Sequence, residues 1–112
     1  MLTALNYCHR RAIVHRDVKL ENFFLDYQET DKQITVKLAD FGIAQQAVTI
    51  KNLSGVAGTL AYMAPEVITR QKYDQKADCW SLGVILYEML TNKHPYLKNS
   101  ESKLSLSALQ RM

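Results

Sequence analysis

The sequence predicts an α+β fold that is mostly helical and carries one short antiparallel β-hairpin. Two runs rich in β-branched and aromatic residues, FFLDY and ITVKLAD, are separated by the polar stretch QETDKQ, which is the pattern of two paired strands. The stretch DQKADCWSLGVILYEMLTNKHPY is apolar over most of a helical circumference, which is typical of a buried helix. A content of 47% hydrophobic and 22% charged residues over 112 residues indicates one small globular domain.

The first part of the chain predicts one helix and then the hairpin. Apolar residues recur at helical spacing in MLTALNYCHRR, which predicts a helix at the start of the sequence. The polar stretch from His15 to Asn22 lies between the apolar pair Ile13 and Val14 and the run FFLDY. We therefore expect this stretch to form a loop between two extended segments.

The second part predicts a long loop and two further helices. The stretch between Phe41 and Tyr62 has no clear period and is rich in Gly, Ser, Thr and Gln, so we expect a long functional loop. APEVITR predicts a short helix with Pro65 in its first turn. The main helix is expected over 76–91, and 97–112 is a divergent tail with a weak helical pattern.

Charge and composition exclude several classes of partner. The net charge of +3 comes without a run of five like charges, so we expect a solvated surface that binds no nucleic acid. The longest apolar run, LGVILYEML, is too short to span a bilayer, and no secretory signal is visible. Cys8 and Cys79 lack a C-x-x-C spacing and are typical of buried thiols in a reducing compartment. We expect an intracellular, cytoplasmic protein.

The polar loops contain the side chains that phosphoryl transfer requires. Asp40 and Asn22 supply oxygen ligands that suit Mg²⁺, and Lys19 can reach a transferring phosphate. Asp17 is then left to accept a proton from an attacking hydroxyl. Each residue also has a purely structural explanation: a turn for Asp17, a cap for Asn22, a solvated surface position for Lys19 and a loop glycine for Gly42. It is the combination that favours catalysis.

Three motifs in this order resemble the signatures of eukaryotic protein kinases. They are HRDVKLEN at 15–22, DFG at 40–42 and APE at 64–66, and the helix DCWSLGVILYEML follows them. The resemblance implies a partial kinase domain over 1–96, with its catalytic loop at 15–22, its activation segment at 40–66 and its buried helix at 76–91. It implies the mostly helical large lobe of that fold, with the hairpin next to the catalytic loop.

The resemblance also implies roles for individual residues. Asp17 would be the catalytic base, Lys19 would stabilise charge on the γ-phosphate of ATP, and Asn22 and Asp40 would hold Mg²⁺. Thr59 would lie near Asp17 and Lys19 at the peptide-binding edge. Lys19 and Thr59 also make the chain similar to serine/threonine kinases rather than tyrosine kinases.

Further residues would surround the nucleotide and support the loop. The backbone around Glu21 would lie near the ATP ribose. Phe24 falls where the family places a leucine or methionine under the adenine, and the alternative is a strand phenylalanine in the core. His15 and Phe41 match two positions of an apolar stack, and Asp78 matches an aspartate that accepts hydrogen bonds from the backbone of the HRD turn.

Regulation by phosphorylation is a second implication of the resemblance. In kinases with an arginine at the position of Arg16, a phosphate on the activation segment pairs with that arginine and orders the loop. The candidate acceptors are Thr49 and Ser54, phosphorylated by an upstream kinase or by autophosphorylation. The alternative is that these hydroxyls are ordinary loop residues. Ser54 lies one residue from the commonest family position, which is Gly55 here.

The family's small lobe has no counterpart in this sequence, which contains no G-x-G-x-x-G loop. We therefore expect the small lobe to be absent and the isolated chain to bind ATP poorly. The leading hypothesis is a serine/threonine kinase that phosphorylates proteins with ATP and Mg²⁺, represented by a truncated catalytic domain. The alternatives are a non-catalytic interaction module and a chain without function.

Overall fold

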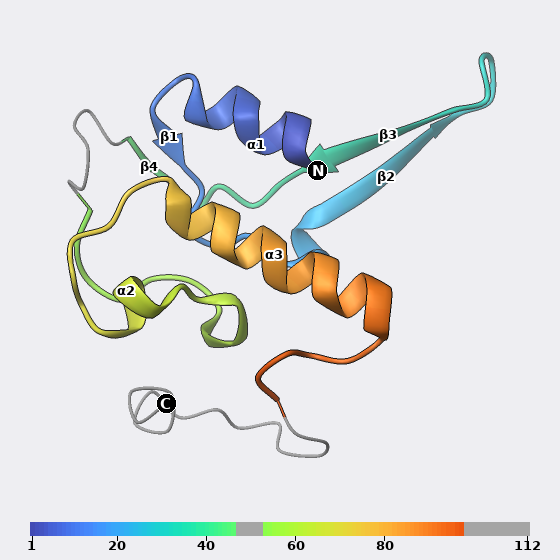
Figure 1. The fold of residues 1–112 in the computed structure, drawn as a ribbon. Coiled ribbons are helices and arrows are strands. Elements are labelled where there is room, and N and C mark those ends of the chain that lie inside the picture. The colour runs from blue at the N-terminus through green and yellow to red at the C-terminus, as the bar shows by residue number, and fades with distance from the viewer. Residues whose placement is uncertain (47–52, 98–112) are drawn as a thin grey trace.

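The computed structural model describes residues 1–46 and 53–97, and its fold mixes helices with two small antiparallel sheets (Figure 1). The expected tail at 97–112 lies outside the described residues from residue 98 onward. The elements in chain order are α1 (Leu2–His9), β1 (Ile13–Val14), η1 (Leu20–Asn22), β2 (Phe23–Gln28), β3 (Gln33–Leu38), β4 (Gln45–Gln46), η2 (Leu60–Tyr62), α2 (Pro65–Ile68) and α3 (Lys76–Thr91).

The hairpin of β2 and β3 confirms the strand prediction. The two strands pair antiparallel over their whole length, from Phe23 opposite Leu38 to Gln28 opposite Gln33. Figure 1 shows the far end of this hairpin projecting away from the helices. Its base is held at the core, because Phe23 and Leu38 pack against a buried cluster. The base of the hairpin is therefore the part that fixes the end of the loop at 15–22.

Helix α3 has the predicted bounds and contributes to two apolar clusters. Leu82 and Ile85 pack with Leu5 of α1 and with Val18 in one cluster. Ala77 belongs to the other, whose remaining buried members are Val14, Leu53, Met63, Ala64, Val67, Ile68 and Tyr73. The helix thus connects the loop at 15–22 with the segment around α2. It ends where Asn92 adopts the left-handed conformation and donates its N–H to the Glu88 carbonyl.

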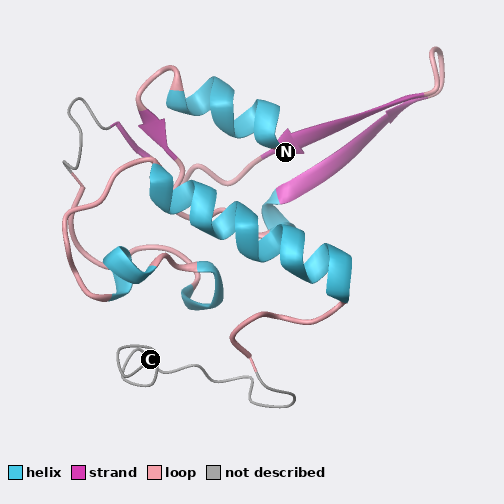
Figure 2. Cartoon of the chain, viewed as in Figure 1, coloured by secondary structure: helices cyan, strands magenta, loops and turns pink. Residues whose placement is uncertain are grey.

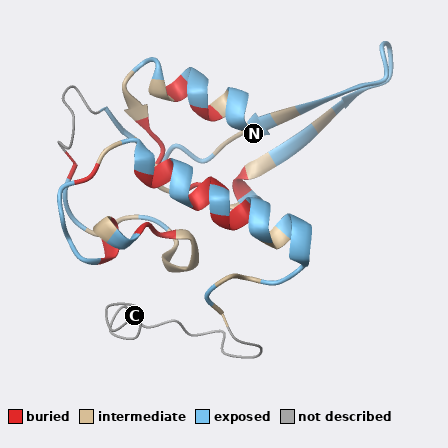
Figure 3. Cartoon of the chain, viewed as in Figure 1, coloured by how far each residue is buried: buried red, intermediate tan, exposed pale blue. Residues whose placement is uncertain are grey.

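Only one side of α3 is covered within the described residues, as the burial colours in Figure 3 show. Leu90 is 85% exposed and Met89 is 59% exposed, and Trp80, Leu86 and Tyr87 are also exposed. The prediction that both cysteines are buried is wrong for Cys79, which lies on this uncovered side, whereas Cys8 is buried. No helix within the described residues is long and apolar enough to cross a lipid bilayer.

The expected loop between Phe41 and Tyr62 contains two short elements that the sequence did not indicate. Gln45–Gln46 forms β4, which pairs antiparallel with β1, and Leu60–Tyr62 forms the 3₁₀ turn η2. Figure 2 shows the rest of the described part of this stretch as loop. The short helix predicted from APEVITR is confirmed as α2, with Pro65 in its first turn.

Candidate active site

The loop at 15–22, which we expected to be catalytic, begins at a backbone turn that is held by a side chain of α3. The buried carboxylate of Asp78, 1% exposed, accepts hydrogen bonds from the backbone N–H groups of His15 and Arg16, each at 2.9 Å. Arg16 has a φ of 67°, a strained value for a non-glycine residue. The contact expected for Asp78 is therefore confirmed, and it holds a backbone conformation that the chain would not adopt unaided.

His9 at the end of α1 completes the partners of Asp78. Its Nε2 lies 2.8 Å from Asp78 Oδ2 and donates to it, because a carboxylate oxygen can only accept. A buried carboxylate requires such donors to offset its lost hydration. Sequence reasoning placed His9 on a helix but gave it no role, since its partner is 69 residues away.

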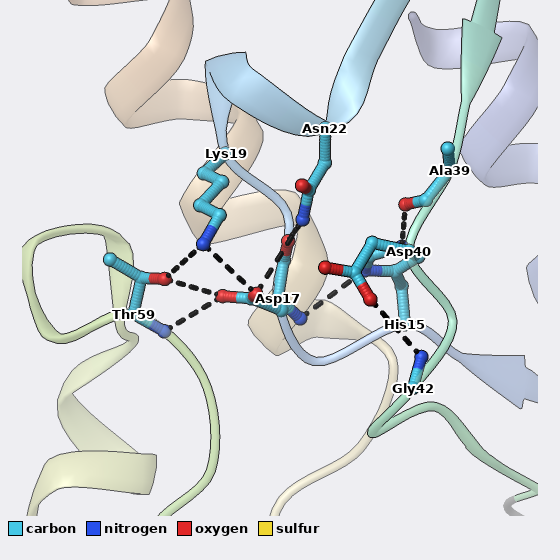
Figure 4. A network of polar contacts seen from close by, with 8 residues as sticks. All are labelled: His15, Asp17, Lys19, Asn22, Ala39, Asp40, Gly42 and Thr59. Carbon is cyan, nitrogen blue, oxygen red and sulfur yellow. Dashed lines mark hydrogen bonds and ion pairs between the residues drawn. The ribbon is translucent and has the colours of Figure 1, made fainter.

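The Asp17 carboxylate is the centre of a polar cluster that joins the loop at 15–22 to the segment before α2 (Figure 4). Asp17 Oδ1 accepts from the Thr59 hydroxyl at 2.6 Å and from the Thr59 N–H at 2.9 Å. Lys19 Nζ lies 3.2 Å from Asp17 Oδ2 and donates to the Thr59 hydroxyl at 3.0 Å. The structure thus brings Asp17, Lys19 and Thr59 together, although Thr59 is 42 residues from Asp17.

The environment of Asp17 keeps its carboxyl group ionised. Burial by itself raises the pKa of Asp17, but the hydrogen bonds from Thr59 and Lys19 and the charge of the Lys19 ammonium outweigh it, so the pKa lies below its ordinary value. At neutral pH the group is therefore an acceptor with no proton of its own. This is the state that a base or an electrostatic anchor needs.

His15 connects Asp17 to the DFG segment. Its Nε2 donates to the Ala39 carbonyl at 2.8 Å, and its Nδ1 accepts from the Asp17 N–H at 3.2 Å. These partners require the neutral Nε2-protonated ring. Phe41 packs edge-on against the same ring, with 4.7 Å between the ring centroids. His15 and Phe41 therefore lie in direct contact, and the residue before Asp40 is tied to the catalytic loop.

Asn22 and Asp40 fit the donor set of a magnesium ion. The Asn22 amide nitrogen donates to the Asp17 carbonyl at 2.8 Å, which leaves the amide oxygen of Asn22 as an acceptor. The backbone N–H of Ala39 donates to the Asn22 carbonyl at 2.9 Å. Asp40 is the next residue in the chain, so this bond holds its backbone near Asn22. Among the described residues, no group of three or more His, Cys, Asp or Glu could hold a metal. Mg²⁺ needs few protein oxygens when phosphate supplies the others.

Gly58 allows the segment before α2 to approach the loop at 15–22. Its φ is 108°, and a Cβ added there would lie 2.2 Å from the Arg16 carbonyl oxygen. Glycine is therefore required both by conformation and by space. The neighbouring Thr59 can reach Asp17 only because the backbone passes this close. Sequence reasoning missed this role, although a glycine directly before Thr59 was a visible signal.

The two remaining nucleotide candidates, Glu21 and Phe24, both lie at the surface. Glu21 belongs to η1 and is exposed. Phe24 is 56% exposed on β2, opposite Lys37 of β3. The alternative of a core phenylalanine is therefore wrong for Phe24, because alternation along the strand turns Phe23 toward the core and Phe24 away from it.

Among the regulatory candidates, Arg16 has partners other than a phosphate. Its Nε donates to the Ile43 carbonyl at 2.7 Å, and its Nη1 donates to the Tyr73 hydroxyl at 3.4 Å. Ser54 is exposed and follows Leu53, which pairs through both backbone groups with Tyr73. Thr49 lies outside the described residues.

The chain matches a known protein family and several curated proteins. Residues 1–112 match the model of the protein kinase domain family. The chain is 44% identical over 97 residues to the serine/threonine-protein kinase SAPK3 of Oryza sativa subsp. indica, which covers 86% of this chain and 28% of SAPK3. It is 43% identical over 104 residues to SRK2C of Arabidopsis thaliana, which covers 92% of this chain and 29% of SRK2C. It is 41% identical over 113 residues to SRK2I of the same plant, and this match covers 100% of this chain and 30% of SRK2I.

The chain therefore belongs to the protein kinase family, and its relatives place it among the serine/threonine-protein kinases. It spans less than a third of the length of these curated relatives.

Proposed function

We propose that the natural polypeptide carrying this chain transfers the γ-phosphate of Mg·ATP to serine and threonine hydroxyls of proteins in the cytoplasm. The observation that supports this most is the ionised Asp17 carboxylate, fixed by Thr59 on one oxygen and faced by Lys19 on the other. Because the chain spans less than a third of its relatives, the activity is proposed for the whole polypeptide.

Asp17 Oδ2 is the oxygen that would accept the proton of the substrate hydroxyl. Each carboxylate oxygen offers about two acceptor sites, and both sites of Oδ1 are taken by Thr59. Within the described residues, Oδ2 has the 3.2 Å contact with Lys19 and a long 3.5 Å contact with Asn22. A hydroxyl oriented toward Oδ2 would therefore find an acceptor that the protein already holds in place.

The other polar side chains would stabilise charge and hold the nucleotide. Lys19 places an ammonium group next to the base, where it would face the transferring phosphate. Asn22 and Asp40 would hold Mg²⁺, which when bound neutralises charge on the phosphate oxygens. Glu21 would lie near the ribose and the exposed ring of Phe24 would contact the adenine. These residues belong to a large-lobe portion at 1–96.

Regulation would act through Arg16. A phosphate on Ser54 or Thr49, added by an upstream kinase or by autophosphorylation, would offer Arg16 a doubly charged partner in place of the Ile43 carbonyl and the Tyr73 hydroxyl. The exposure of Ser54 supports its accessibility to such a kinase.

The test is phosphate transfer from γ-labelled ATP to an arrayed set of serine, threonine and tyrosine peptides, with Mg²⁺ and then with EDTA. We expect label on serine or threonine, none on tyrosine, and loss of transfer with EDTA. Replacing Asp40 with Asn should raise the Mg²⁺ concentration needed for half-maximal rate. Absence of transfer to every peptide from the full-length polypeptide would refute the proposal.

Binding without catalysis is the second candidate function, and the uncovered apolar side of α3 favours it. This function predicts a chain of residues 1–112 that stays folded and monodisperse in isolation. Size-exclusion chromatography with circular dichroism separates the cases: aggregation or an unfolded spectrum would exclude a free-standing binding module.

A further inference from the structure

His94, in the loop that follows α3, has both of its ring nitrogens bonded. Its Nε2 lies 2.9 Å from the Ala61 carbonyl oxygen. Its Nδ1 accepts the backbone N–H groups of Tyr96 and Leu97, each at 3.1 Å. A carbonyl can only accept and a backbone N–H can only donate, so the ring is neutral and carries its proton on Nε2. One side chain thus folds its own loop through Nδ1 and reaches a distant segment through Nε2.

Aromatic packing fixes the orientation of the His94 ring. Tyr62 and Tyr96 meet it edge-on, with centroid distances of 5.8 Å and 6.0 Å. Tyr96 in turn stacks on Trp80 of α3, with 5.9 Å between centroids and 7° between the planes. The ring is therefore supported from α3 and from η2, and its Nε2–H is aimed at η2 before any ligand arrives.

The segment that His94 reaches is the one that holds the proposed base. Ala61 lies in η2, two residues after Thr59, whose backbone and side chain both bond Asp17. Two further contacts join η2 to α3 through Tyr62. Its carbonyl accepts from the Ser81 hydroxyl at 2.7 Å, and its own hydroxyl donates to Glu88 at 2.9 Å. His94 adds a third attachment, at the neighbouring Ala61 carbonyl.

His94 and Tyr62 also form part of the wall of an open cavity of about 470 Å³. The lining also includes Leu20 and Glu21 of η1, which directly follow Lys19. Glu88 and Met89 of α3 line the same cavity. A shift of η2 would therefore change both the shape of this cavity and the position of Thr59.

We propose that His94 is a positioning residue for binding of the protein substrate, acting through the Ala61 carbonyl on the segment from Thr59 to Tyr62. This inference rests on the proposed kinase function for its link to substrate. Among the described residues, the hydrogen bonds of His94 reach neither Asp17 nor the residues proposed to hold Mg²⁺. We therefore expect His94 to affect binding of the peptide rather than of ATP.

Two matched substitutions distinguish the role of His94 Nδ1 from that of Nε2. In His94→Asn, the amide oxygen can occupy the place of Nδ1 and keep the local turn, but nothing reaches Ala61. In His94→Gln, the longer side chain can place an amide N–H where Nε2 lies and restore the bond to Ala61. If positioning of η2 matters, Gln rescues what Asn does not.

The first readout is steady-state kinetics of the full-length polypeptide with its best serine or threonine peptide. We expect His94→Asn to raise KM for the peptide by roughly tenfold, the loss of about one hydrogen bond, with KM for ATP within about twofold of the parent. His94→Gln should return KM for the peptide to within about threefold. Equal peptide KM values for the parent and His94→Asn would overturn the proposal.

The second readout is amide hydrogen exchange over residues 59–63, which requires no catalysis. The N–H groups of Tyr62 and Met63 are bonded within this segment, so loosening of η2 accelerates their exchange. We expect faster exchange in His94→Asn and parental exchange in His94→Gln. If the parent transfers no phosphate, the proposed kinase function fails on its own, and amide hydrogen exchange alone tests the role of His94. Unchanged exchange rates at 59–63 in His94→Asn would then overturn the positioning role.

Discussion

Replacing Gly58 with alanine should break the link between the catalytic loop and Thr59. The added Cβ would lie 2.2 Å from the Arg16 carbonyl oxygen, well inside van der Waals contact. Restoring ordinary contact requires the two backbones to separate by about 1 Å or more. A shift of that size would stretch the 2.9 Å bond from the Thr59 N–H to Asp17 beyond hydrogen-bond range.

The expected cost follows from the bonds that would be lost. Thr59 donates two hydrogen bonds to the ionised Asp17, and a bond to a charged group contributes about 1.5–3 kcal/mol. Because the site is partly open to solvent, we take the lower end, about 3 kcal/mol in all. The positive φ of 108° adds about 1–3 kcal/mol of backbone strain.

Gly55 supplies the matched control, because its φ is 87° and a Cβ added there would meet nothing within 4 Å. Gly55→Ala therefore measures the strain of a positive φ without the clash. Urea denaturation of the full-length polypeptide should show Gly58→Ala about 3 kcal/mol less stable than Gly55→Ala. A difference below about 1 kcal/mol would refute the reasoning, since the close approach would then not hold Thr59 on Asp17.

Three further predictions concern ionisable groups. Asp78→Asn should lower the free energy of unfolding by about 3 kcal/mol, because the amide nitrogen of asparagine would face a buried N–H group that needs an acceptor. A loss under about 1 kcal/mol by urea denaturation would contradict this. Because the pKa of Asp17 is lowered in the folded state, its ionised carboxyl group stabilises the fold above pH 3.8. This stabilisation is lost as the pH falls through the folded-state pKa. The parent should therefore lose stability relative to Asp17→Asn on acid titration, and parallel curves would argue against it. Burial and the neighbouring Glu88 carboxylate raise the pKa of Tyr62, so the parent should lose stability relative to Tyr62→Phe as the pH rises above 10. If stability fell equally with pH in both proteins, this environment of Tyr62 would be wrong.

Local pattern was enough to predict most of the fold. The bounds of α3 and the pairing of β2 with β3 follow from periodicity and turn composition, which act within a few residues. The sequence indicated an extended segment at Ile13 and Val14, but strand β4 and its pairing with β1 were missed. Pairs of residues carry no period, and the two strands lie about thirty residues apart in the chain. The exposure of Cys79 was missed because an apolar pattern does not reveal which side of a helix finds a partner.

The candidate site was predictable to a different degree in each part. Asp17, Lys19 and Asn22 stand close in sequence, so motif and chemistry indicated them together. In the folded chain, His9 contacts a carboxylate and His94 contacts a carbonyl group, and both partners are distant in the sequence. Histidine is common in many settings, so neither residue gave a signal before the geometry was known.

The central claim is that Asp17 is the base of a phosphoryl-transfer site. Its most direct test is kcat for phosphate transfer by the full-length polypeptide, compared among the parent, Asp17→Asn and the control Asp31→Asn in the exposed hairpin turn. We predict a loss of at least about 100-fold for Asp17→Asn, the range of general-base catalysis, and parental activity for Asp31→Asn. A kcat for Asp17→Asn within about threefold of the parent would contradict the account.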